Sequence, residues 1–343
     1  MKIAQVAPPI ERVPPHKYGG TERIVSFLTE QLVADGHDIT LFASGDSQTK
    51  ATLISCCDKA LRLDPAVREY LPHLIIQIEQ VRQYADRFDV VHFHTDLLHY
   101  PLCRQLGKKA VTTLHGRLDF PDLVPYFKFF TDSQVVSISN AQRGPLPNLN
   151  YVATIHHGLP ENLLPYSPRA SGGYLAFLGR ICPEKCPDRA IEISKRAGLP
   201  LKIAAKVDRV DQAYYDERIK PMIAANPHVK YIGEIDEKQK AAFLGNAVAL
   251  LNPIDMPEPF GLVMIEAFSC GTPAVVFRRG SVAEVMEHGV SGLVVESVDE
   301  AVEACRLVGS LDRAAVRHTF ERRFTASQMA QNYVDLYRRI LAR

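Results

Sequence analysis

The 343-residue sequence has no apolar run that approaches the roughly 18–20 residues needed to cross a membrane. Its net charge is only +1 at pH 7, so neither nucleic acid nor another polyanion is expected as the main partner. The first residues, Met1 to Val6, form a short strand-like run that leads into prolines, which is not the pattern of a signal peptide. We therefore expect a cytoplasmic protein without an integral membrane segment.

Cysteine pairing and a metal site are also not expected. The seven cysteines are an odd number, in a chain long enough to form a core without disulfides. Cys182 and Cys186 are the nearest to a pair, but no matching Cys or His pair completes a zinc site. His92, His94 and His99 stand close together without a matching pattern of carboxylates. Reduced, structural thiols are the expectation.

Short runs of valine, isoleucine and leucine alternate with longer segments of helical period. This alternation is typical of βαβ units around a buried parallel sheet. Ile24, Leu28 and Leu32, for example, recur at the spacing of one helix face, and Gly36 follows as a stop. The expected strands are residues 2–7, 39–43, 89–94, 110–115, 134–139 and 151–155, then 174–178, 201–206, 229–232, 247–252, 274–277 and 293–295.

A stretch rich in proline, serine, asparagine and glycine separates the two series of strands. It predicts a linker at residues 161–173 between a first domain, 1–160, and a second domain, 174–323. Residues 324–343 follow as a terminal segment, in which the stretch 326–341 is amphipathic. Two successive α/β series predict two doubly wound domains, whose ligands lie beyond the carboxyl ends of the strands.

The most informative segment is residues 258–266, EPFGLVMIE, which follows the expected strand at 247–252. A helix beginning near Gly261 leaves its first backbone N–H groups without intrahelical partners, at the positive end of the helix dipole. Such a helix start can hold phosphate or sugar oxygens, and glycine allows a close approach. The Glu266 carboxylate, further into the helix, can accept from two vicinal hydroxyls. The residues alone also allow Glu258 to cap the helix and Glu266 to be solvated.

This segment resembles the E-x7-E motif of the family-4 retaining glycosyltransferases. Two positions depart from that family's pattern: Cys186 stands where glycine is frequent, at a helix start, and His157 stands where asparagine is frequent, at a hinge. Other segments that resemble the family occur in the same order along nearly the whole chain: YGGTE at 18–22, TLHG at 113–116, HGL at 157–159, FLGR at 177–180 with Glu184-Lys185, AFSCGTP at 267–273, and Phe324, Tyr333 and Tyr337 near the end.

The resemblance implies a GT-B fold, in which two Rossmann-like domains face each other across a cleft and the last helix crosses back to the first domain. It implies a metal-independent, retaining transfer of a hexose from a nucleoside-diphosphate sugar to a hydroxyl acceptor. UDP-glucose is the first expectation for the donor and GDP-mannose the second. Arg180 and Lys185 would hold the diphosphate in place of a metal, and the chain has no D-x-D triplet. No cofactor is expected.

The same resemblance assigns the remaining site residues. Glu266 would bind the ribose hydroxyls, Glu258 would face the donor sugar, and His115 would lie over that sugar. With Arg180 and Lys185, Glu258 and His115 form the expected catalytic group. The backbone of Phe260, Gly261, Leu262 and Val263 and the residues Gly19, Gly20 and Lys206 complete the donor site, and Tyr18, His94 and Asp96 are candidates for the acceptor side.

Two other functions stay compatible with the sequence. A non-hydrolysing sugar-nucleotide epimerase shares the fold and the donor, but it turns the donor over without an acceptor. A catalytically silent module would bind the nucleotide sugar without turnover. An NAD(P) dehydrogenase is disfavoured, because the first strand opens onto a proline-rich loop and not onto the G-x-G-x-x-G turn that binds a pyrophosphate.

Overall fold

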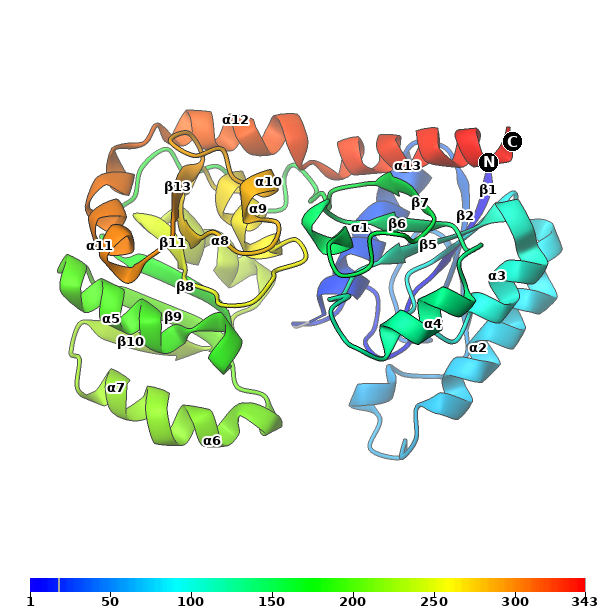
Figure 1. Cartoon of the computed structure of the whole chain (residues 1–343), viewed down its shortest axis with the longest axis horizontal. Coiled ribbons are helices and arrows are strands. Elements are labelled where there is room, and N and C mark those ends of the chain that lie inside the picture. Colours follow the sequence, from blue (N-terminus) through cyan, green and yellow to red (C-terminus); the bar gives the residue numbers. More distant parts are fainter. Residues whose placement is uncertain (18, 343) are drawn as a thin grey trace. The chain divides into compact units, whose positions relative to one another are not determined.

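The computed structural model describes residues 1–17 and 19–342, and the chain divides into two compact units. Unit 1 contains Met1–Pro160 and Ala326–Arg343, and unit 2 contains Glu161–Thr325. Each unit is a parallel sheet covered by helices (Figure 1). The predicted fold class, two doubly wound α/β domains with a last helix that returns to the first, is confirmed.

Unit 1 is built on a seven-stranded sheet in the order β3-β2-β1-β4-β5-β6-β7. The central strands are buried, mostly apolar runs, as expected for a parallel sheet with helices on both faces, and the two edge strands are partly exposed. They are β1 (Lys2–Val6), β2 (Asp38–Ala43), β3 (Thr52–Ser55), β4 (Val90–Phe93), β5 (Ala110–Leu114), β6 (Val135–Ser137) and β7 (Tyr151–Thr154).

The two longest helices of unit 1 each bury an apolar stripe. Helix α1 (Gly20–Ala34) buries Ile24, Leu28 and Leu32, the residues whose spacing predicted it. The last helix, α13 (Ala326–Leu341), contacts α1 and buries Tyr333 and Tyr337 completely (Figure 1). The other helices of this unit are α2 (Leu71–Tyr84), α3 (Tyr100–Leu106) and α4 (Leu123–Phe129).

Unit 2 is built on a six-stranded sheet in the order β10-β9-β8-β11-β12-β13. Its strands are β8 (Leu175–Arg180), β9 (Leu201–Lys206), β10 (Val229–Gly233), β11 (Ala249–Asn252), β12 (Ala274–Phe277) and β13 (Gly292–Val295). Its helices are α5 (Pro187–Ala197), α6 (Gln212–Tyr214), α7 (Lys220–Ala224), α8 (Glu237–Gly245), α9 (Leu262–Ser269), α10 (Val282–Val285), α11 (Val298–Leu307) and α12 (Arg313–Arg323).

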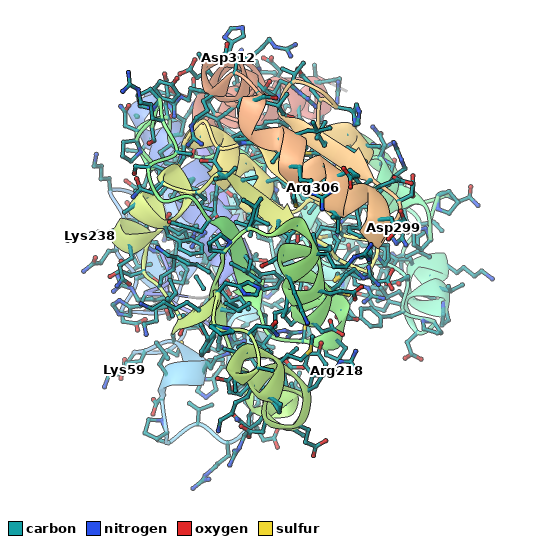
Figure 2. All side chains as sticks on the ribbon, turned by 90° about the vertical axis from the view of Figure 1, so that its left-hand side faces the viewer. Lys59, Arg218, Lys238, Asp299, Arg306 and Asp312 are labelled. Carbon is teal, nitrogen blue, oxygen red and sulfur yellow. The ribbon has the colours of Figure 1, made fainter. Side chains whose placement is uncertain are left out.

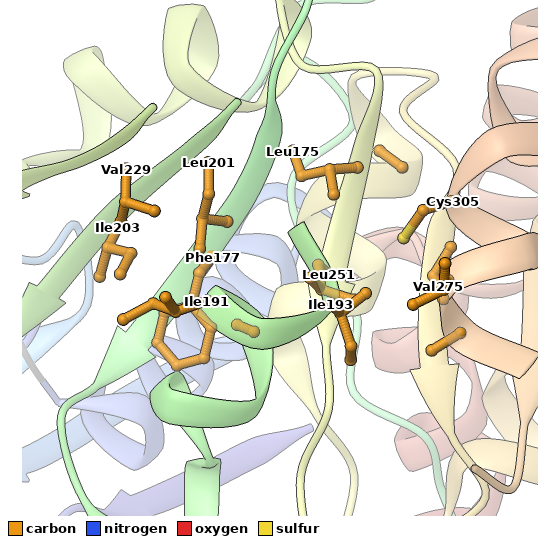
Figure 3. Close-up of a cluster of buried hydrophobic side chains, with 14 of the residues drawn as sticks. Leu175, Phe177, Ile191, Ile193, Leu201, Ile203, Val229, Leu251, Val275 and Cys305 are labelled. Atoms are coloured by element: carbon orange, nitrogen blue, oxygen red, sulfur yellow. The ribbon is translucent and has the colours of Figure 1, made fainter. Parts of the chain in front are cut away.

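The core of unit 2 lies between one face of this sheet and the helices α5 and α11. Leu251 and Val275, on neighbouring strands, lie near Ile193 of α5 and Cys305 of α11 (Figure 3). Side chains alternate between the two faces along a strand, so Leu250 and Val276, which neighbour these residues in sequence, lie on the other face of the sheet. Right-handed connections that run in opposite directions along the sheet place α5 and α9 on these two opposite faces.

The surface of the chain carries charge of both signs. Figure 2 shows labelled side chains such as Arg306 and Asp299 projecting outward from the ribbon. Many of these charges form exposed ion pairs, for instance Arg218 with Asp188 at 2.8 Å, and such pairs contribute little to stability. Across residues 1–17 and 19–342, no helix combines the length and apolar character that a membrane crossing requires.

In each sheet the strand order reverses once, and this reversal locates the candidate site. The reversal lies between β1 and β4 in unit 1 and between β8 and β11 in unit 2. The connections that follow the two strands at such a point leave in opposite directions, so a crevice opens beyond their carboxyl ends. The residues predicted for the site follow β1, β4 and β5 in unit 1, and β8, β9 and β11 in unit 2.

Candidate active site

In unit 2 the two loops that part at the strand reversal are joined by direct contacts. The Asp255 N–H, beyond β11, donates to the Glu184 carbonyl, beyond β8, at 2.9 Å. Lys185, on the same turn as Glu184, forms an ion pair with Glu258. Both side chains are largely buried, so this charge-assisted hydrogen bond is less screened than a surface pair. The structure thus brings together two of the predicted catalytic residues.

A third loop, beyond β12, holds the backbone at Glu258. Gly280 has φ +56°, and a Cβ atom there would lie 2.3 Å from the Glu258 carbonyl oxygen, so only glycine fits. The Ser281 N–H donates to the same carbonyl at 2.9 Å, and the Ser281 hydroxyl donates to the Phe260 carbonyl at 2.9 Å. These bonds fix the path of the chain from Glu258 to Phe260.

Helix α9 begins directly after this fixed loop. Gly261 is its N-cap, with φ +82°, in the left-handed region that favours glycine. The N-cap position has no side-chain hydrogen bond, so Glu258 does not have the capping role that the sequence left open. Glu258 forms an ion pair with Lys185 instead. The N–H groups of Leu262 and Val263 lie in the first turn and have no intrahelical partner. This helix start can accept an anionic oxygen of a ligand.

Glu266 lies on the buried side of α9, with only 1% of its surface exposed. It is therefore not solvated, which was the alternative that the sequence had allowed. Its Oε1 atom accepts from Lys240 Nζ at 2.7 Å, and Lys240 is itself buried on α8. A buried carboxylate without a cation would be very unfavourable, so Lys240 is what allows Glu266 to be charged there. A carboxylate has two oxygens and can accept several hydrogen bonds at once.

Arg180 and Lys206 end the neighbouring strands β8 and β9 and lie directly beside each other in the register of the sheet. Both are already engaged by carboxylates. Arg180 lies 3.4 Å from Asp211 and 3.6 Å from Asp208, and Lys206 Nζ lies 2.7 Å from Asp208. A diphosphate would have to compete with these carboxylates for the two cations, which the sequence motifs did not reveal.

In unit 1 the predicted glycine loop lies at the start of α1. Gly19 is the N-cap with φ +146°, and Gly20 is the first residue of the helix. Tyr18 lies outside the described residues. In the first turn of α1, burial raises the pKa of Glu22 to about 7, so this carboxyl group changes charge near neutral pH. Glu22 was quoted within the motif, but no role was predicted for it.

His94 and His115 lie together beyond β4 and β5. His94 Nδ1 is 2.9 Å from His115 Nε2, and burial lowers the pKa of His115 to about 3, so its ring is neutral near pH 7. The ring of His157 stacks on His115, with ring centroids 5.2 Å apart and an interplanar angle of 16°. His157 is therefore packed in the histidine cluster and is more than a hinge residue. Asp96 is exposed on the loop that follows His94.

Lys240 and Gly280 are residues of the site that the motifs did not reveal. A signal for Lys240 was present, because it precedes the buried Phe243 and Leu244 by three and four residues and therefore lies on the buried face of α8. Gly280 follows a strand in a turn-like sequence, and nothing local shows that its backbone packs on Glu258. Within the two described stretches of the chain, no three His, Cys, Asp or Glu side chains are placed to hold a metal ion.

The fold and these sites define a two-domain α/β protein of the GT-B type with a candidate anion and hydroxyl site in unit 2. The model of the family described as Glycosyltransferase Family 4 matches residues 18–143. The model described as Glycosyl transferases group 1 matches residues 168–317. The two matches follow each other along most of the chain, and the chain belongs to glycosyltransferase family 4.

Individual relatives agree with this assignment. The chain is 25% identical to the glycogen synthase of Mycobacterium tuberculosis, over 88% of this chain and 84% of that protein. Among solved structures it is similar to AviGT4, a glycosyltransferase involved in avilamycin A biosynthesis, with 23% identity and a TM-score of 0.74 over 100% of this chain and 98% of the other. HepE of Anabaena, in complex with UDP and glucose, has 18% identity and a TM-score of 0.74 over 98% of both chains. At these identities the two structures establish the fold.

The buried pair of Lys240 and Glu266 gives a prediction about stability. Lys240→Met removes the cation that is hydrogen-bonded to this buried carboxylate, which should lower the free energy of unfolding by about 3–5 kcal/mol. The matched control is Lys238→Met, because Lys238 is an exposed lysine on the same helix (Figure 2); this change should alter stability by less than about 0.5 kcal/mol. Urea unfolding of both variants measures the difference.

The double variant Lys240→Met/Glu266→Met removes the uncompensated charge and should recover most of the stability that Lys240→Met loses. Equal unfolding curves for Lys240→Met and Lys238→Met would show that Glu266 does not depend on Lys240.

Proposed function

We propose that this glycosyltransferase transfers a hexose from a nucleoside-diphosphate sugar to a hydroxyl acceptor, with retention of the anomeric configuration and without a metal ion. UDP-glucose is the first choice of donor and GDP-mannose the second. The observation that carries the proposal is the group of Lys185, Glu258 and the start of α9 at the strand reversal of unit 2.

The chemistry of this group fits the parts of such a donor. Glu258 offers carboxylate oxygens to sugar hydroxyls, and the N–H groups of Leu262 and Val263 suit a phosphate. Glu266 would accept from the vicinal hydroxyls of the ribose while Lys240 keeps it charged. Lys185 and Arg180 would stabilise the negative charge that grows on the departing diphosphate.

The relatives favour UDP-glucose. HepE has been solved with UDP and glucose and also with UDP-glucose itself, and its chain matches this one over nearly its full length. Retention is proposed because the family is a retaining one. In the proposed reaction the leaving phosphate takes the proton of the acceptor hydroxyl on the same face of the sugar, so that no protein nucleophile is required.

The proposed division between sugar and phosphate subsites predicts different defects in two variants. Arg180→Ala should weaken binding of the free nucleoside diphosphate about tenfold and also slow turnover, because Arg180 would contact the phosphates. Glu258→Ala should leave that binding within about threefold but slow turnover about 100-fold, about 3 kcal/mol of transition-state stabilisation. Isothermal titration with UDP, together with single-turnover transfer from UDP-glucose, measures both effects.

Glu303 and Arg306 supply matched controls, because they form an exposed ion pair on α11. Their alanine variants should change neither UDP affinity nor turnover. Equal losses of UDP affinity in Arg180→Ala and Glu258→Ala would contradict the division into subsites, and unchanged turnover in both would contradict the site itself.

Metal independence has a test of its own. Transfer from UDP-glucose should proceed at an unchanged rate in the presence of EDTA, because lysine, arginine and a helix start would supply the positive field that a metal supplies in other transferases. The measurement is the initial rate with EDTA and after addition of Mg²⁺ or Mn²⁺. A rate that falls on chelation and returns with either metal would contradict this part of the proposal.

The same assay separates the two competing functions. Conversion of the nucleotide sugar without any acceptor, to a sugar of altered configuration, would identify an epimerase. Tight binding of UDP without conversion of any donor would identify a silent binding module.

A further inference from the structure

A chain of buried hydrogen bonds in unit 1 runs from the first strand to His115. Gln5, fully buried on β1, has its Oε1 atom 2.6 Å from His94 Nε2. His94 Nδ1 is in turn 2.9 Å from His115 Nε2. An amide oxygen can only accept, so the hydrogen in the first of these bonds is on His94 Nε2.

This one hydrogen determines where the others lie. Burial lowers the pKa of both His94 and His115 below the usual value for histidine, so each ring is neutral near pH 7 and carries one proton. With its proton on Nε2, His94 must accept at Nδ1, and His115 must donate from its Nε2. The Nδ1 atom of His115 is thereby left with a lone pair.

The amide of Gln5 also contacts the last helix. Its Nε2 atom donates to the hydroxyl of Tyr337 on α13 at 3.2 Å. That hydroxyl lies 2.7 Å from His92 Nδ1, and His92 Nε2 lies 2.7 Å from the hydroxyl of Thr113. Tyr337 therefore accepts from Gln5, and its hydroxyl also shares a hydrogen bond with His92. The returning helix thus supplies the hydrogen-bond partner of the Gln5 amide nitrogen.

The opposite direction is disfavoured at His115. The Nδ1 atom is buried and has no hydrogen-bond partner within residues 1–17 and 19–342. Reversal would turn the Gln5 amide and place a hydrogen on this atom, and an unpaired buried N–H is less tolerated than an unpaired lone pair. The His115 residue as a whole is partly exposed, so this acceptor lies just below the surface.

We infer that Gln5 and His94 are positioning residues for His115: they hold it in the tautomer protonated at Nε2, so that Nδ1 accepts a hydrogen bond from a hydroxyl group of a bound substrate. The stacked ring of His157 fixes the plane of His115 in the same cluster. The inference rests on the proposed function for its substrate, but the tautomer is a property of the protein alone.

The first test uses the unaltered full-length protein. Long-range ¹H–¹⁵N correlation spectra of ¹⁵N-histidine-labelled protein distinguish a protonated ring nitrogen from one with a lone pair, and His115→Ala identifies the signal. We expect His115 with the proton on Nε2. A proton on Nδ1 of His115 at pH 7 would overturn the inference, whatever the behaviour of any variant.

The second test breaks the chain of hydrogen bonds at its origin. Gln5→Leu removes the acceptor for His94 Nε2, so the His94 proton should move to Nδ1 and force the His115 proton onto its own Nδ1. This should lower kcat/KM for the nucleotide sugar tenfold or more, because the substrate hydroxyl loses its acceptor. Tyr333→Phe is the matched control: it deletes a buried hydroxyl 2.8 Å from the Thr113 hydroxyl, leaves both bonds of His94 intact, and should preserve the tautomer and the rate within about twofold.

An unchanged His115 tautomer in Gln5→Leu would overturn the inference, and so would a rate loss in Tyr333→Phe equal to that in Gln5→Leu. If the tautomer changes as expected while the unaltered protein transfers no sugar from any donor, the positioning role stands and the proposed function fails. The two failures are therefore distinguishable.

Discussion

The reversal of strand order in each parallel sheet is the constraint on which the site depends. Buried parallel strands end at one edge, and where the order reverses, the following loops leave in opposite directions. In unit 2 this happens between β8 and β11, and the ion pair of Lys185 with Glu258 links the two loops. The fixed glycines 261 and 280 then set where α9 begins and where Glu258 lies. The chemistry of the candidate site thus follows from the topology.

Buried charge imposes a second constraint on unit 2. Glu266 is almost fully buried, and the buried Lys240 pairs with its carboxylate. Arg180 and Lys206 are likewise matched by the aspartates beyond β9. The side chains of this site are therefore nearly balanced in charge before any ligand enters. If a diphosphate binds there as proposed, the start of α9 would add a positive field of its own.

The strands and the order of the domains were predictable, because each buried parallel strand is a continuous apolar run. Strands β9 and β12 begin and end at the predicted residues. The short strand β3 was not predicted, because Thr52–Ser55 lies at the edge of its sheet, half exposed, without such a run. Motifs likewise indicated Glu258, Glu266 and Lys185, but neither the pairing of Lys185 with Glu258 nor the role of Lys240. Pairing across loops and helices depends on long-range packing, which leaves only weak traces in local sequence, as at Lys240.

We propose above all that the start of α9 and the loop before it bind the nucleotide part of a donor. Hydrogen–deuterium exchange of the full-length protein, measured with and without saturating UDP, tests it most directly. We expect UDP to slow exchange chiefly in residues 258–266, with a smaller effect around Arg180 and Lys185. This binding site would be contradicted if UDP bound but left the exchange of residues 258–266 unchanged and protected only segments elsewhere in the chain.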